Sequence, residues 1–245
     1  MLVKPIRTPL VNIGDDLGQI LISNLPPLEE KSVVVVTSKV VALCQGRVFA
    51  KETGTKEEKQ ALVRQEADQY LEATESKYQV MLTIKDAVLA VNAGIDESNV
   101  LDHYVGLPED SYRSAREIWQ LLREHFGVRE LGVIISDSAS LPLKWGTIGR
   151  ALAHCGVRPL KDLIGQPDLY GRPLAMTKMN LVEGIASAAV LEMGEGAEQT
   201  PVAVVSQLTH AEFSDQPPTR SEIDELLIEL EDDVYYPLLR GMKRD

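Results

Sequence analysis

The chain has 245 residues, of which 44% are hydrophobic and 25% charged, a composition typical of a globular protein with one large or two small domains. Its formal net charge of −12 disfavours nucleic acid as the main ligand, because affinity for a phosphate backbone rests on clustered Lys and Arg. The two cysteines, Cys44 and Cys155, have neither metal-site nor redox-motif spacing, so we expect reduced thiols.

The start of the chain contains no apolar segment of signal-peptide length. No stretch reaches the roughly 18 apolar residues that a membrane span requires. We therefore expect a cytoplasmic protein with no membrane partner.

The first half of the chain predicts two strands and one helix. Residues 32–41 open with four valines and lie between Pro26-Pro27 and Gly46, which is typical of a buried strand. Residues 51–76 are polar with apolar side chains spaced along one face, which predicts an exposed helix. Residues 87–91 predict a further strand, which leads into a polar loop at 92–99.

The middle of the chain predicts a helix followed by a strand. Residues 111–126 carry apolar side chains at helical spacing, and Gly127 stands where a helix is capped by glycine. Residues 131–135 are an apolar strand, and Asp137 follows directly. We therefore expect a second strand end to deliver a carboxylate.

The last third predicts a helix at 180–193 and a short strand at 202–205. From residue 216 the chain becomes acidic, and the apolar spacing in 221–231 predicts an appended helix. We expect a mixed α/β domain over residues 1–215 and a helical tail over 216–245.

Common nucleotide-binding and hydrolase motifs are absent from the sequence. It contains no GxGxxG, GxxxxGK[ST], HExxH or GxSxG. Instead, three carboxylates stand in loops that contain glycine or hydroxyl residues: Asp96, Asp137 and Glu195. Carboxylate and hydroxyl oxygens are the ligands that Mg²⁺ and Mn²⁺ prefer, so a metal-nucleotide site is chemically permitted.

Each of these residues also has a structural explanation. Asp96 could cap a helix or form an Asx turn, Asp137 could belong to a turn after its strand, and Glu195 could be a solvated loop acid. Ser38 and Lys39 suit a phosphate, but an edge-strand lysine is the commoner case. The four histidines are scattered, and none is assigned to catalysis. The patterns alone thus indicate an α/β protein with a candidate metal site.

Several longer strings carry a resemblance to a known family over about residues 8–206. They are VVVVTSKVVALCQGRV, AVNAGIDESNV, LPEDSYRSAREI, GVIISDSASLPLKWGTIGRALAHCGVRPLKDLIGQPDLYGRPL and EGIASAAVLEMGEGAEQTPVAVV. In this order they resemble the blocks of the coenzyme F420-0:L-glutamate ligase family, the γ-glutamyl ligases.

The resemblance implies an intertwined homodimer with an uncommon mixed α/β fold. It also implies a ligase that uses GTP or ATP and two divalent ions per site, Mg²⁺ or Mn²⁺. Such an enzyme would add L-glutamate to the carboxylate of an F420-0-like or folate-like acceptor through an acyl phosphate.

The same resemblance assigns roles to particular residues. Ser138 stands where the family usually has threonine, which keeps the hydroxyl. The implied metal ligands are Asp96, Asp137, Ser138 and Glu195. The implied catalytic residues are Asp96, Asp137 and Lys39. The implied nucleotide contacts are Pro9, Leu10, Val11, Asn12, Ser38, Lys39, Asn99, Met193 and Gly194.

Three departures from the family pattern bear on activity. Leu43 replaces a lysine, while Leu141 and Lys144 replace two arginines of the loop that follows Asp137. Neither Leu141 nor Lys144 reproduces the planar fork with which Arg binds carboxylate or phosphate. These changes leave the acceptor open between F420-0 and folate types. They also leave two alternatives: a non-catalytic nucleotide-binding relative that has lost the acceptor site, and a structural dimer whose acidic tail recruits a partner.

Overall fold

The computed structural model describes residues 1–73 and 77–243 and has a central five-stranded sheet. The strand order is β1-β12-β2-β8-β9, with β2 and β8 parallel and the other neighbours antiparallel. The expected mixed α/β fold is confirmed. The strands are β1 (Leu2–Ile6), β2 (Ser32–Thr37), β8 (Leu131–Ser140), β9 (Thr147–Cys155) and β12 (Val202–Ser206).

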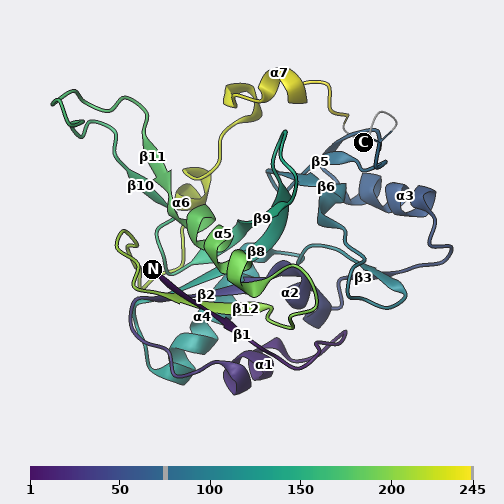
Figure 1. Cartoon of the computed structure of the whole chain (residues 1–245), viewed down its shortest axis with the longest axis horizontal. Helices are drawn as coiled ribbons and strands as arrows, with labels where there is room; N and C mark the ends of the chain where they lie inside the picture. The colour runs from purple at the N-terminus through teal and green to yellow at the C-terminus, as the bar shows by residue number, and fades with distance from the viewer. Residues whose placement is uncertain (74–76, 244–245) are drawn as a thin grey trace.

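The two faces of this sheet are covered by different helices. Val34 and Val36 of β2 pack in a core with α1 (Leu17–Asn24) and α4 (Ser111–Phe126). Val33 and Val35 pack in a second core with α5 (Leu181–Met193), which lies in front of the sheet in Figure 1. The valine run is therefore apolar throughout because alternate side chains enter opposite cores.

Two expectations about strand ends were wrong. The predicted strand 32–41 stops at Thr37, and α2 (Ser38–Cys44) begins at the next residue. Conversely, the strand predicted at 131–135 continues as β8 to Ser140, because β9 pairs with it as far as Ser140 and Thr147. Asp137 and Ser138 therefore lie inside a strand, just beyond a register shift between Ile135 and Ser136.

A smaller sheet lies beside the main one, at the right of Figure 1. Its order is β4-β5-β6, and all pairs are antiparallel. The predicted helix 51–76 was wrong in extent: α3 ends at Glu66, after which the chain extends to pair with β5, and residues 74–76 lie outside the described part. The strand predicted at 87–91 is confirmed as β6. The elements here are α3 (Lys56–Glu66), β4 (Gln69–Leu71), β5 (Leu82–Lys85), β6 (Val88–Val91) and the 3₁₀ turn η2 (Asn92–Gly94).

The helices predicted at 111–126 and 180–193 are confirmed. Gly127 ends α4 in the left-handed conformation, with φ of 69°. Asn180 caps α5 by accepting the N–H of Glu183. Cys44 and Cys155 are free thiols, as expected. β3 (Val48–Ala50) and β7 (His103–Val105) form a two-stranded antiparallel pair, and β7 contacts α2.

The tail and a long hairpin arm complete the chain. The arm is formed by β10 (Leu160–Asp162) and β11 (Lys178–Asn180). The single helix predicted at 221–231 was wrong: the tail forms α6 (Arg220–Asp224), the 3₁₀ turn η3 (Leu230–Asp232) and α7 (Tyr236–Leu239). α6 buries no side chain, and residues 221–233 contain no Lys or Arg that could pair with the many acids, so a longer helix gains little packing and no favourable charge pairs beyond Arg220–Asp224. Within the described residues, no helix has the length and apolarity needed to span a membrane.

Close packing at Gly149 sets the position of α5. Gly149 lies opposite Ser138 in the β8–β9 register, and a Cβ there would stand 2.5 Å from the Ala186 carbonyl oxygen of α5. We expect Gly149→Ala to destabilise the fold by about 1–3 kcal/mol, the usual cost of overpacking. The control Gly184→Ala, on the open side of α5, should stabilise it by about 0.5–1 kcal/mol. Urea unfolding measures both, and equal effects would contradict this packing.

Candidate active site

Four segments that are distant in sequence meet in a closed ring of polar contacts at the junction of the two sheets. They are the start of α2, the loop after η2, the middle of β8 and the loop after α5. We call this arrangement the polar ring. Two of the segments, α2 and β8, are regular elements with buried side chains, and the other two are loops.

The first contact of the ring joins α2 to β8. Because β2 and β8 are parallel and Thr37 pairs with Ser136, the residues that follow them are neighbours: Ser38, the first residue of α2, and Asp137 in β8. The Ser38 hydroxyl donates to Asp137 Oδ1 at 2.9 Å. Burial raises the pKa of Asp137, against the lowering effects of this hydrogen bond and of Arg150. The site thus contains a carboxylate whose charge is poorly compensated.

The second contact joins α2 to the loop after η2. Lys39 Nζ lies 2.5 Å from Asp96 Oδ2 and donates to Ser98 Oγ at 2.8 Å. Burial raises the pKa of Asp96, but the hydrogen bonds from Lys39 and from the Ser98 backbone outweigh it and lower the pKa to about 2. Asp96 is therefore ionised throughout the physiological range.

The remaining two contacts close the ring through the loop after α5. Asn99 Nδ2 donates to the Gly196 carbonyl at 3.2 Å. The Ser138 hydroxyl lies 2.9 and 2.8 Å from the two Glu195 carboxylate oxygens. Four of the five segments with predicted site residues are thus linked, and Asp96 is near enough to Asp137 to raise its pKa further.

The donor chemistry of the ring fits a hard divalent cation. Asp137 forms no ion pair with the described cationic side chains, whereas Asp96 is paired with Lys39. A partly desolvated carboxylate without a close counter-charge is a natural ligand for Mg²⁺ or Mn²⁺. Across the described residues, no three His, Cys, Asp or Glu side chains converge closely enough to hold one ion together. The four-residue ligand set therefore stays a prediction.

The other predicted nucleotide contacts are not among the residues whose contacts define the polar ring, and they lie in two further segments. Residues 9–12 are in the loop between β1 and α1, where Asn12 is bound to Asp15 and the Val11 side chain packs on the α2–β7 cluster. Pro9, Leu10 and Asn12 are exposed. Met193 is 2% exposed, so its side chain belongs to the core under α5, while Gly194 ends that helix with φ of 80°.

Sequence reasoning missed Arg150 and Glu183. Arg150 pairs with Asp137 in the β8–β9 register and donates to the Leu89 carbonyl of β6, so it joins the two sheets beside the polar ring. Burial lowers its pKa, while Glu183 and Asp137 raise it. The sequence signal for Arg150 is the turn at residues 141–146: a hairpin closed there places Arg150 opposite Asp137.

Comparisons with known proteins show which sequences this chain is similar to. Residues 5–207 match the sequence model of a family described as F420-0:Gamma-glutamyl ligase. The chain is 36% identical over 209 residues to a Coenzyme F420:L-glutamate ligase of Methanosarcina barkeri, covering 80% of this chain and 81% of that protein. A protein of the same name from Methanopyrus kandleri is 35% identical over 79% of this chain and 81% of its own length. Another, from Archaeoglobus fulgidus, is 35% identical over 89% and 92%, respectively.

The charge of Asp137 should cost stability. Its pKa is higher in the folded chain than in the unfolded one, so stability falls as pH rises through the folded value. With divalent ions chelated at pH 7, we expect Asp137→Asn to stabilise the fold by about 1 kcal/mol, within the range for relieving functional strain. The gain should shrink as the pH is lowered toward 4, because Asp137 becomes protonated in the folded chain first.

The exposed Asp224→Asn provides the control for a general charge effect. Thermal unfolding of the three proteins between pH 4 and pH 8 is the measurement. An Asp137→Asn protein less stable than the parent at pH 7 would show that this carboxylate is structural.

Proposed function

The chain belongs to the F420-0:gamma-glutamyl ligase family, and from this we propose that it joins L-glutamate to the carboxylate of an F420-0-like acceptor by an amide bond. The observation that carries the proposal is the polar ring, which gathers Ser38, Lys39, Asp96, Asp137 and Glu195 from four segments. Amide formation from a carboxylate requires activation, and this collection of acids and a cation suits a phosphoryl donor.

We further propose that GTP or ATP activates the acceptor. The acceptor carboxylate oxygen attacks the γ-phosphorus, the bond to the β-phosphate oxygen breaks, and a nucleoside diphosphate leaves. The amine of L-glutamate then attacks the acyl carbon, loses a proton, and displaces inorganic phosphate. The product amide and the phosphate account for all atoms of the transferred group.

The residues of the ring have separate roles in this proposal. Lys39 is half-buried and already pairs with an anion, so its ammonium can approach the phosphates. Asp96, Asp137, Ser138 and Glu195 would hold two divalent ions, which supply charge neutralisation to the transferring phosphoryl group. Ser38 fixes the Asp137 carboxylate, and Asn99 links the loop after η2 to the loop after α5. In this proposal Asn99 would also contact the nucleotide.

The acceptor class is proposed from the relatives. Each of the three that we compared is named a Coenzyme F420:L-glutamate ligase, which favours an F420-0 acceptor. Leu141 and Lys144 lie in the exposed tip of the β8–β9 hairpin, a few residues beyond the polar ring. Because these two residues replace arginines of the family pattern, acceptor binding can differ from that of the relatives, and a folate-like acceptor is the second substrate to test.

We also propose that the protein is a homodimer. The β10–β11 arm projects away from the main sheet on the side opposite the small sheet (Figure 1) and presents Leu169, Tyr170 and Met176 with at least 85% of each side chain exposed. Apolar side chains at the end of such an arm are typical of an interface. Sedimentation equilibrium at the mass of a single chain would contradict the dimer.

The ligase proposal predicts a mass gain of one glutamyl residue on the acceptor. The protein is incubated with L-glutamate, Mg²⁺ and Mn²⁺, GTP or ATP, and either F420-0 or tetrahydrofolate monoglutamate in separate reactions, and products are read by mass spectrometry. Lys39→Met should lower turnover about 100-fold or more, as expected for a lost phosphate contact. Lys31→Met, at the opposite end of β2, should behave as the parent.

Bound nucleotide without a mass gain on either acceptor would contradict catalysis and favour a binding-only relative. Equal turnover by the Lys39→Met and Lys31→Met proteins would remove Lys39 from the site. A gain on tetrahydrofolate alone would keep the ligase and change its acceptor.

A further inference from the structure

The C-terminal segment runs from one sheet to the other. It lies beyond residues 5–207, the part that matches the family. In Figure 1 the yellow segment leaves α6 beside the main sheet, crosses the top of the view through α7, and ends beside β5 and β6. We call residues 212–243 the strap.

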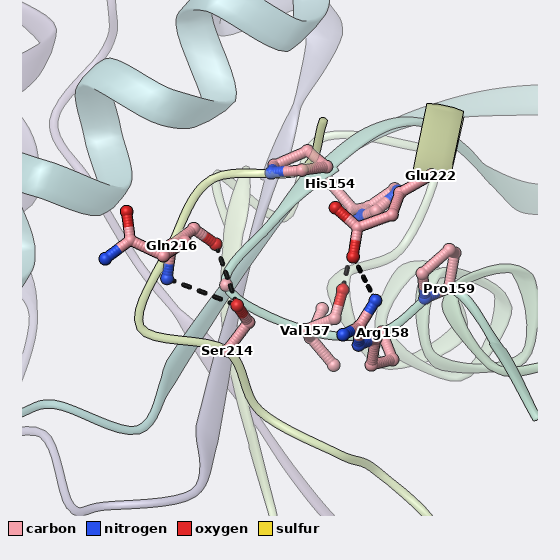
Figure 2. Close-up of a pocket in the computed structure, with 9 residues that line it drawn as sticks. His154, Val157, Arg158, Pro159, Ser214, Gln216 and Glu222 are labelled. Atoms are coloured by element: carbon pink, nitrogen blue, oxygen red, sulfur yellow. Dashed lines mark hydrogen bonds and ion pairs between the residues drawn. The ribbon is translucent and has the colours of Figure 1, made fainter. Parts of the chain in front are cut away.

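The first end of the strap is bound to the end of β9. Phe213 pairs with Val157, the Arg158 N–H donates to the Glu212 carbonyl at 2.8 Å, and Phe213 packs on the core under α5. Figure 2 shows Glu222 turned toward Arg158, with which it forms an ion pair. The cavity at this junction has a volume of about 10 Å³, which is room for one water at most. The first end of the strap is therefore packed closely against the end of β9.

The other end of the strap is bound to the small sheet. Lys243 pairs with Tyr70 of β4 through two backbone hydrogen bonds, of 2.9 and 2.8 Å. Lys243 Nζ also lies 3.7 Å from Glu72, and Leu239 is 7% exposed. Between these ends, residues 227–235 are mostly exposed. The strap is therefore anchored at two places and open to solvent between them.

Tyr70 connects the second anchor to the polar ring. It shares one buried cluster with Ala93 and Ile95, and Ile95 directly precedes Asp96. The segment that leads to Asp96 is therefore packed in the core of the small sheet, while the Asp96 backbone pairs with β7. The main sheet carries Asp137 on β8, so the relation between the two carboxylates depends on how the sheets are joined.

Besides the polar ring itself, two side-chain contacts between described residues join the small sheet to the main sheet near the site. Arg150 donates to the Leu89 carbonyl, and the rings of Tyr78 and Trp145 meet edge to face with centroids 6.1 Å apart. Both contacts use the β8–β9 hairpin.

Asp96 is also held by two backbone hydrogen bonds with Val105 of β7, of 2.9 and 2.8 Å, and by the ion pair with Lys39 of α2. The pairing of Lys243 with β4 adds a separate tie, at the edge of the small sheet that is not paired with β5.

We propose that the strap is a positioning element: the pairing of Lys243 with Tyr70 holds the small sheet, and with it Asp96, in register with Asp137. The proposal rests on the proposed function, in which these two carboxylates act together. It assigns to the tail a role within the chain, in contrast to recruitment of a partner protein.

Two substitutions at one position separate the backbone pairing from the side chain. Lys243→Pro removes the N–H that donates to Tyr70, and Lys243→Ala keeps that N–H but loses the ion pair with Glu72. Arg220→Ala is a second control, because it breaks only an exposed ion pair within the tail.

Hydrogen exchange of the ligand-free protein is the first readout. Amides of residues 69–71 and 92–97 should exchange about tenfold faster in Lys243→Pro than in Lys243→Ala, while amides of β2 and β8 stay unchanged. In the ligase assay, kcat should fall about tenfold for Lys243→Pro with little change in the nucleotide KM. If that protein does not fold, a chain ending at Met242 replaces it.

Equal exchange at 92–97 in the two proteins would overturn the proposal. Faster exchange with unchanged kcat would also overturn it, because the strap would then stabilise the small sheet without positioning the site. If the parent forms no amide on any acceptor, the proposed function fails, whereas the exchange experiment still decides whether the strap holds the Asp96 loop.

Discussion

The parallel pairing of β2 with β8 is the constraint on which the site depends. It aligns Thr37 with Ser136, so the two strands lie side by side at this point of the sheet. After Thr37 the backbone turns into α2, whereas β8 continues beyond Ser136, which leaves Ser38 and Asp137 within hydrogen-bond distance. Parallel strands are buried on both faces, and the four valines provide that burial.

Around this pairing, the two main carboxylates lie in environments that shift their pKa values in opposite directions. Asp96 is stabilised as an anion by Lys39 and backbone N–H groups, whereas the charge of Asp137 is opposed by burial. Carboxylates with divergent environments at one junction are characteristic of functional sites. The stability lost at Asp137 is compensated by the two cores on either side of the main sheet.

The sequence predicted best those elements whose burial follows from a pattern within the element itself. The α4 helix, with its single apolar face and Gly127, could be predicted, as could the buried valines. The ends of β2 and β8 could not, because the turn at Ser38 and the extension through Asp137 depend on pairing with strands that are distant in sequence.

The site likewise contains residues that the sequence predicted and residues that only the structure reveals. Resemblance to the family drew attention to Asp96, Asp137 and Glu195, and the structure places their segments in one ring. Periodicity gave no reason to include Arg150, whose position follows from hairpin register, or Lys243, whose partner Tyr70 lies 173 residues earlier in the sequence. Contacts of this kind are set by tertiary packing and leave no local pattern.

The central claim is that acceptor activation proceeds by attack of a carboxylate on the γ-phosphate at this junction. It is tested most directly by supplying an acceptor labelled with ¹⁸O in its carboxylate and analysing the released phosphate by mass spectrometry. The account predicts that ¹⁸O from the acceptor appears in inorganic phosphate in step with amide formation. Amide formation with unlabelled phosphate, or with ¹⁸O in a nucleoside monophosphate, would contradict it.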